Sequence, residues 1–100
     1  MFVIQTKTGI VTPYTLIIDG NLDTTTSPLL EEKFSDITDD ITEVVFDFTK
    51  LSYISSAGLR TILLVNEIIG DDGVLTVRGA NPMVKDIFDA TGFSDLLNLE

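Results

Sequence analysis

Hydrophobic positions along the chain follow two periods, the alternation typical of strands and the wider spacing typical of helices. β-branched and aromatic residues fill two runs near the start, and Thr8-Gly9 between them predicts a turn. Pro13 interrupts the second run, so a bulge or an edge position is expected there. A third run, Val44 to Phe48, is short and mostly apolar, as in a central strand covered on both faces. The expected strands are residues 2–7, 11–19, 44–48 and 74–78.

A first helix is expected where apolar residues begin to recur at helical spacing. Ser27 is the expected N-cap, and Pro28 suits the first helical position because its missing N–H would have no partner there. The helix is expected to end before or near Ile41. Its inward face is predicted to consist of Leu30, Phe34, Ile37 and Ile41.

Two more helices are predicted further along the chain. The second is expected over residues 57–69, after a linker at residues 49–54, and Gly70 follows its last residue. The third is expected to open with the cap pair Asn81-Pro82 and to end at Gly92. The tail beyond Gly92 is expected to add a short helix or strand.

The order of these elements predicts the fold class. Strands alternate with helices after residue 20, which indicates an α/β domain with a mixed sheet. The chain has 100 residues, and 44% of them are hydrophobic, enough for one core. A single domain is therefore expected over residues 1–100.

Net charge and composition exclude several classes of partner. The formal net charge of −10 argues against a nucleic-acid surface, which needs clustered cations, and against anionic membranes. No run of about 18 apolar residues is present, and the N-terminus lacks a signal-peptide pattern. The absence of cysteine excludes disulfides. These features fit a cytoplasmic protein.

Few kinds of catalysis are open to this composition. The chain contains no histidine and no cysteine, so nucleophile systems that need either residue are excluded, as are zinc sites built from them. Asp47 at the end of a strand invites comparison with a phosphorylated receiver aspartate, but the acidic cluster and lysine that receivers need are not visible. No enzyme activity, cofactor or metal site is expected.

Residues 53–60, Tyr-Ile-Ser-Ser-Ala-Gly-Leu-Arg, join the central strand to the second helix. Ser55 and Ser56 place hydroxyls beside the N–H groups that open a helix. The same N–H groups and the helix dipole would stabilise a phosphate there. On the residues alone, the junction fits either a helix cap or a phosphorylation switch.

The stretch from Val44 to Arg60 resembles the signature of STAS domains (sulphate transporter and anti-sigma factor antagonist), especially the small stand-alone antagonists. Residues 19–23 are similar to the family's turn before the first helix. Residues 81–88 and 91–93 resemble its third helix and the turn after it. The resemblance covers almost the whole chain. It implies a mixed sheet of four or five strands with helices mainly on one side.

By this resemblance, the chain is a phosphorylation-controlled switch rather than an enzyme. The unphosphorylated domain would bind an anti-sigma factor that is also a serine kinase, and phosphorylation would end the complex. A PP2C-type serine phosphatase would reset it, and ATP and magnesium would belong to these partners. A monomer or weak dimer is expected. The alternatives are a constitutive STAS scaffold or assembly subunit that is never phosphorylated, and a small-molecule or nucleotide binder.

Aligned on Gly58 and Leu59, Ser56 occupies the position of the family's phosphorylated serine. The sporulation-type motif has Asp before that serine and Ser after it, whereas Ser55 and Ala57 stand there in this chain. Ser55 is thus an alternative target. The resemblance implies a partner-binding face made of Asp23, Thr24, Ser55, Ser56, Gly58, Leu59 and Arg60.

Each of these residues also has a plain structural interpretation, which for Ser56 is the N-cap of the second helix. Asp23 and Thr24 fit ordinary turn chemistry. Gly58 would allow another backbone to approach the helix closely. For Leu59, a core position is favoured over a partner contact. Arg60 is expected beside the serine, where it would pair with a partner's acid, pair with Asp23 or remain exposed.

Overall fold

The computed structural model describes residues 2–7, 14–37, 41–70 and 72–100, and in this part five strands form one sheet in the order β1-β2-β3-β4-β5. The strands are β1 (Val3–Lys7), β2 (Tyr14–Leu22), β3 (Glu43–Ile54), β4 (Val74–Arg78) and β5 (Asn98–Leu99). The helices are α1 (Ser27–Glu31), α2 (Ser56–Ile69) and α3 (Pro82–Thr91), with 3-10 turns η1 (Glu32–Asp36) and η2 (Phe93–Asp95). The β1–β2 pair is antiparallel and the other pairs are parallel, so the sheet is mixed.

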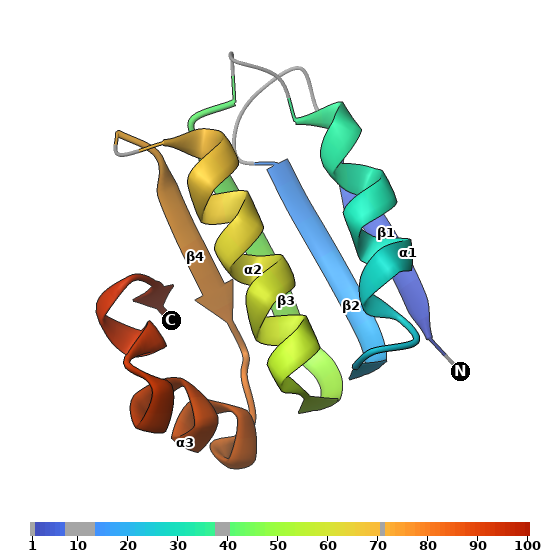
Figure 1. The fold of residues 1–100 in the computed structure, drawn as a ribbon, viewed down its shortest axis with the longest axis vertical. Helices are drawn as coiled ribbons and strands as arrows, with labels where there is room; N and C mark the ends of the chain where they lie inside the picture. Colours follow the sequence, from blue (N-terminus) through green and yellow to red (C-terminus); the bar gives the residue numbers. More distant parts are fainter. Residues whose placement is uncertain (1, 8–13, 38–40, 71) are drawn as a thin grey trace.

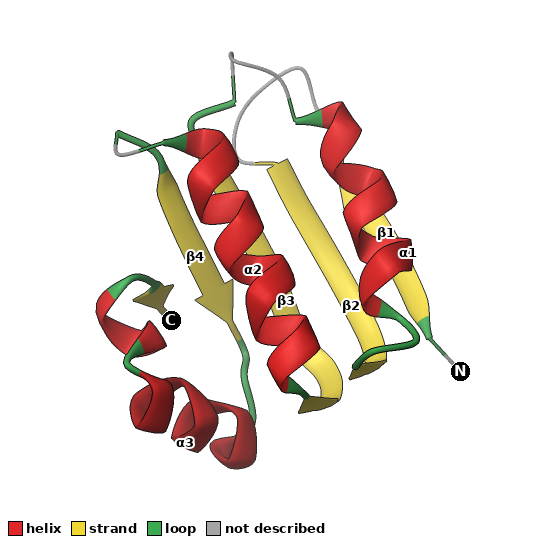
Figure 2. Cartoon of the chain, in the orientation of Figure 1, coloured by secondary structure: helices red, strands yellow, loops and turns green. Residues whose placement is uncertain are grey.

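Helices α1 and α2 lie side by side over the same face of the sheet (Figures 1 and 2). Helix α3 packs where β3 and β4 finish (Figure 1). The parallel strands follow one another in chain order across the sheet, so each crossover proceeds in the same direction and returns on the same side. This arrangement confirms the expected α/β class with a mixed sheet and helices mainly on one side.

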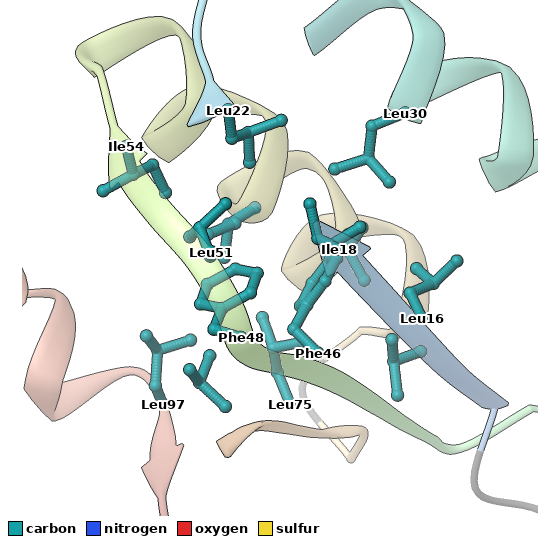
Figure 3. Packing of buried hydrophobic residues seen from close by; sticks show 14 of the residues in the cluster. Leu16, Ile18, Leu22, Leu30, Phe46, Phe48, Leu51, Ile54, Leu75 and Leu97 are labelled. Atoms are coloured by element: carbon teal, nitrogen blue, oxygen red, sulfur yellow. The ribbon is translucent and has the colours of Figure 1, made fainter. Parts of the chain in front are cut away.

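The core fills the space between the sheet and these helices. Leu16 and Ile18 of β2 lie beside Phe46 and Phe48 of β3 (Figure 3), and all four side chains are fully buried. Ile62 of α2 belongs to the same cluster and is also fully buried. Burial of a side chain of this size stabilises a fold by about 1.5–3 kcal/mol. The cluster therefore fixes α2, and the junction before it, against the sheet.

Strand β3 is central, as expected. On its second face Val45 is buried, at 7% exposure, but further along the strand that face is open to solvent. Phe46 and Phe48 face the helices, and Asp47 between them faces the other way because side chains alternate along a strand. There Asp47 forms an ion pair with Arg78 at 3.5 Å, and the Arg78 side chain is 49% exposed. The second face of the sheet therefore carries charged groups open to solvent.

Strand β3 is also longer than the sequence pattern predicts. Residues 49–54 were expected to be a linker, but they continue the strand and pair with the end of β2. Leu51 and Ile54 are buried three positions apart, because register shifts interrupt the pairing and with it the alternation. This extension carries β3 directly to the start of α2.

The first helix begins differently from the prediction. Ser27 is the first helical residue rather than the N-cap, a position that belongs to Thr26. The α-helix ends at Glu31 and the chain continues as a 3-10 turn, which is tighter and suits short segments. The expected inward residues Leu30, Phe34 and Ile37 are buried, and Ile41 lies beyond the helix and is partly buried.

The other helix ends follow local sequence chemistry. Asn81 is the N-cap of α3, and its Oδ1 accepts a hydrogen bond from the Val84 N–H at 2.9 Å. Gly92 ends α3 with φ of 80°, a left-handed conformation that favours glycine. Helix α2 begins at Ser56, one residue earlier than predicted, and Gly70 follows its last residue. The tail adds both η2 and β5.

Two expectations concern residues outside the described part of the chain, the turn at Thr8-Gly9 and the bulge at Pro13. They stay predictions. Among the helices that the structure does describe, none combines the length and apolarity needed to span a bilayer.

Candidate protein-interaction site

The ends of β2 and β3 hold two loops together at one edge of the sheet. Leu22 pairs with Ile54 in the last register position of the two strands. The Ser55 N–H then donates to the Leu22 carbonyl oxygen at 2.9 Å. The loop that follows β2 and the first turn of α2 are consequently neighbours, although about 30 residues separate them in the chain. Most of the predicted site residues lie in these two segments.

Ser55 is the N-cap of α2. Its backbone is extended, with φ of −98° and ψ of 177°, and its side-chain oxygen accepts a hydrogen bond from the Gly58 N–H at 3.4 Å. Its carbonyl oxygen accepts the first helical bond, from the Leu59 N–H at 3.0 Å. The interpretation of Ser56 as the cap is therefore wrong, because the helix begins one residue earlier than the pattern indicates.

Ser56 occupies the first helical position and is exposed, whereas Ser55 is half-buried. The first turn of α2 contains no acidic side chain, so α2 itself supplies no anion to the positive end of its dipole. The first N–H groups of a helix have no partner within it. The exposed hydroxyl thus lies where a negative charge is locally favoured.

Because Ser55 and not Ser56 caps α2, substitution of the two serines is expected to change the free energy of unfolding by different amounts. Ser55→Ala is expected to lower the free energy of unfolding by about 0.5–1 kcal/mol, the lower range for a lost cap because the capping bond is long. Ser56→Ala should change it by less than about 0.5 kcal/mol, since an exposed alanine suits a helix. Urea denaturation of both variants checks this. A larger loss in Ser56→Ala than in Ser55→Ala would contradict the assignment.

Gly58 and Leu59 face inward. A Cβ on Gly58 would lie 2.8 Å from the Leu22 carbonyl oxygen and 2.7 Å from Ile54 Cγ1. The expected close approach of another backbone is thus confirmed, and that backbone is β2. Leu59 is 7% exposed and belongs to the core cluster, which was the favoured interpretation. Neither residue offers a partner much surface.

The loop between β2 and α1 is held by its own side chains. Asp23 Oδ1 accepts hydrogen bonds from the N–H groups of Thr25, at 2.9 Å, and Thr26, at 3.1 Å. The Thr26 hydroxyl donates to the Asn21 carbonyl oxygen at 2.8 Å and accepts from the Asp23 N–H at 2.8 Å. Asp23 therefore stabilises the turn with its side chain, as its structural interpretation predicted. Thr24, at the tip of the loop, is exposed. A shallow hollow beside the loop is lined by Phe2, Gly20, Asn21, Asp23, Thr25, Thr26 and Ser52.

Two exposed apolar residues at this edge were not predicted. The Asn81 side-chain amide donates to the carbonyl oxygens of Leu51, at 3.1 Å, and Ser52, at 3.3 Å, which ties the start of α3 to the end of β3. Tyr53 and Met83 flank this connection and are 44% and 55% exposed. Because residues 49–54 were expected to be a linker, Tyr53 was not predicted to be an exposed residue of a strand. A methionine two residues after a cap gives no sequence signal of its exposure.

Asp47 lies on the face of the sheet that α2 does not cover. Burial alone would raise the pKa of Asp47, but hydrogen bonds from Thr49 and the nearby charge of Arg78 outweigh it and hold the pKa below the ordinary 3.8. The Asp47 carboxylate accepts from the Thr49 N–H at 3.0 Å and the Thr49 hydroxyl at 2.6 Å. Among the described residues, no cluster of three or more acidic side chains has the spacing to hold a metal ion.

The lowered pKa predicts a pH-dependent stability contribution from Asp47. Its ionised form stabilises the fold at pH values above 3.8, and this contribution is lost as the pH falls through the lower folded-state pKa. Asp47→Asn should therefore be less stable than wild type at pH 7 by up to about 1 kcal/mol, with the deficit shrinking below about pH 4. Urea denaturation across this range checks the prediction. An equal deficit at pH 7 and at the lowest pH would refute it.

Comparison with known proteins places this geometry in a family. The family model of the STAS domain matches residues 1–100. BtrV of Bordetella bronchiseptica, whose name proposes an anti-sigma factor antagonist, is 43% identical over 51 residues, which cover 50% of this chain and 44% of BtrV. The matched segment is thus less than half the length of that relative.

Solved structures share the fold at low sequence identity. An anti-sigma factor antagonist from Mycobacterium paratuberculosis superposes with a TM-score of 0.85 at 19% identity, covering 99% of this chain and 85% of the other. The anti-sigma factor antagonist SpoIIAA in its unphosphorylated form gives 0.71 at 20% identity, covering 98% and 87%. The phosphorylated form of SpoIIAA, a Bacillus cell fate determinant, gives 0.69 at 21% identity, covering 98% and 91%.

Proposed function

The chain belongs to the STAS domain family, and from this premise we propose that it is an anti-sigma factor antagonist controlled by phosphorylation of Ser56. The observation that carries the proposal is the exposed Ser56 hydroxyl at the start of α2, one residue after the capping serine. The same fold is known for SpoIIAA in both unphosphorylated and phosphorylated forms, which supports a fold that tolerates the modification.

In the proposed cycle, the unphosphorylated domain binds an anti-sigma factor that is also a serine kinase, in the cytoplasm. The binding face consists of the first turn of α2 with the exposed Arg60 directly after it, the Asp23–Thr26 loop and the exposed side chains of Tyr53 and Met83. Sequestering the anti-sigma factor frees the sigma factor. The chain itself is a binding protein and performs no catalysis.

The kinase ends the complex by phosphoryl transfer from ATP. The Ser56 oxygen attacks the γ-phosphorus, the bond to the β–γ bridging oxygen breaks, and ADP leaves while the hydroxyl proton passes to a base on the kinase. A PP2C-type phosphatase reverses the state when water attacks the phosphorus. The serine then recovers its proton and inorganic phosphate is released. Both reactions use groups and metal ions of the partner enzymes.

The physics of the site explains why phosphate leaves the fold intact and still opposes binding. Phosphoserine adds about −1.5 to −2 charges. At a helix N-terminus such a charge is favourable by roughly 0.3–1 kcal/mol, so the domain remains folded. In an interface fitted to a neutral hydroxyl, the same charge must be stripped of water without a partner group, which is costly.

The assignment of the cap to Ser55 helps to decide which of the two serines is phosphorylated. It also argues against the alternative of a constitutive scaffold, in which Ser56 would serve only as a helix cap. Ser55 uses its side-chain oxygen to cap α2 and is half-buried, which disfavours it as the phosphorylation site. Ser56 has no capping role that would account for a hydroxyl at this position. Phosphosite mapping after incubation with the captured kinase and ATP tests this choice, because phosphate on Ser55 would refute it.

A further inference from the structure

The outward face of α2 brings Arg60 into line with Ser56. The two residues are four positions apart, which is one helical turn, and both are exposed. The opposite side of the helix is buried, with Ile62 and Val65 fully enclosed in the core. Arg60 therefore has no inward alternative, and its side chain shares the solvent face with the Ser56 hydroxyl.

Arg60 is the single cation of α2, and two acidic residues lie in the segments beside this helix. Asp23 lies in the loop beside the first turn, where two backbone N–H groups already bond its Oδ1. Glu31 of α1 accepts a hydrogen bond from the Thr61 hydroxyl at 3.3 Å. Glu67 is the only acid in α2 and lies near its far end. An anion on Ser56 would thus meet Arg60 as its nearest cation in α2.

We propose that Arg60 binds the phosphate on Ser56 within the same chain, and that this pairing withdraws Arg60 from the partner. The proposal rests on the proposed function and adds a second component to the switch. An anion four residues before a cation is the favoured orientation on a helix. The planar guanidinium also matches a phosphate with two parallel hydrogen bonds, which a lysine cannot form.

Two states of Arg60 follow from this pairing. In the unphosphorylated chain, its guanidinium projects from the binding face and is available to an acidic group of the partner. In the phosphorylated chain, the guanidinium is held against the phosphate and that contact is lost. Phosphorylation therefore both adds a charge to the interface and removes the cation that the interface uses.

The test uses the chain of residues 1–100 with phosphoserine incorporated at position 56 during translation, so that no cognate kinase is needed. The pH at which the phosphate on Ser56 is half protonated, its titration midpoint, is measured by 31P NMR in wild type, Arg60→Lys and Arg60→Gln. Loss of the cation should raise the midpoint in Arg60→Gln by about 0.3, the shift equivalent to a helical ion pair, with Arg60→Lys in between. Arg78→Gln is the matched control, because Arg78 pairs with Asp47 on the other face of the sheet, and its midpoint should equal that of wild type.

The outcomes separate this pairing from the switch itself. Equal midpoints in wild type and Arg60→Gln would overturn the pairing, even if phosphorylation still abolished partner binding. An equal rise in Arg60→Gln and Arg78→Gln would also overturn it, because the effect would then reflect net charge alone. If the midpoint rises only for Arg60→Gln while the phosphorylated chain binds its partner unchanged, the pairing stands and the proposed function fails.

Discussion

A Ser56→Asp variant is expected to fold like wild type and to lose its protein partner. The added carboxylate lies at the start of α2, where the helix dipole favours a negative charge by roughly 0.3–1 kcal/mol. In the interface, the same charge is buried against groups arranged for a neutral hydroxyl. An uncompensated polar group of this kind costs about 1–3 kcal/mol or more, which corresponds to roughly a ten- to hundredfold loss of affinity.

Two measurements separate folding from binding in this variant. Urea denaturation should give a free energy of unfolding for Ser56→Asp that equals or slightly exceeds that of wild type. Surface plasmon resonance with the captured partner should show the loss of affinity. Ser56→Ala is the matched control, since it removes the hydroxyl without a charge and should bind within a few-fold of wild type. Equal affinity for wild type and Ser56→Asp would show that this residue is not the switch.

The second large effect is expected at Gly58. Gly58→Ala should lower the free energy of unfolding by about 1–3 kcal/mol, as overpacked substitutions do. The new Cβ would lie 2.8 Å from the Leu22 carbonyl oxygen and 2.9 Å from Leu22 Cγ, so β2 or α2 must shift. Intrinsic helix propensity acts in the opposite direction, because alanine is favoured over glycine by up to about 1 kcal/mol. A net loss of stability in Gly58→Ala would therefore be due to the close contact with Leu22 and not to the change in helix propensity.

The shift should also reach the site, because the Leu22 carbonyl oxygen accepts the Ser55 N–H bond at 2.9 Å. Gly58→Ala is thus expected to weaken partner binding even where the variant remains folded. Ala57→Gly in the same turn serves as the control, since it changes helix propensity without adding an atom. Guanidinium denaturation of both variants checks the prediction. A Gly58→Ala domain as stable as wild type would show that α2 and β2 are not packed this closely.

Features that depend on nearest neighbours in the chain could be predicted from the sequence. The Asn81-Pro82 pair marks the start of α3, and Gly92 marks its end, because capping and left-handed conformations follow from those side chains alone. The exposure of Ser56 and Arg60 on one face also follows from helical spacing. The shift of the cap from Ser56 to Ser55 is a one-residue error, since two adjacent serines offer the same local chemistry.

Features that depend on distant pairing could not be predicted. The continuation of β3 through residues 49–54 is fixed by the end of β2, and its register shifts place Leu51 and Ile54 out of simple alternation. The position of α3 depends on Asn81 reaching two carbonyl groups of β3. Met83 is brought to this edge of the sheet only through those contacts, so no local pattern marks it, whereas Tyr53 stands two residues before Ser55 in the chain.

The central claim, that Ser56 is a phosphorylation switch, is tested most directly by capture and phosphosite mapping in one experiment. Immobilised wild type, Ser56→Asp and Ser55→Asp are exposed to source-cell lysate, ATP and magnesium are added to the captured material, and mass spectrometry reads both the partners and the modified residue. We predict a serine kinase on wild type, its loss with Ser56→Asp, and phosphate on Ser56 with release of the complex. Identical partners on all three baits, with no kinase among them and no phosphate on Ser56, would contradict the account and indicate a constitutive STAS module.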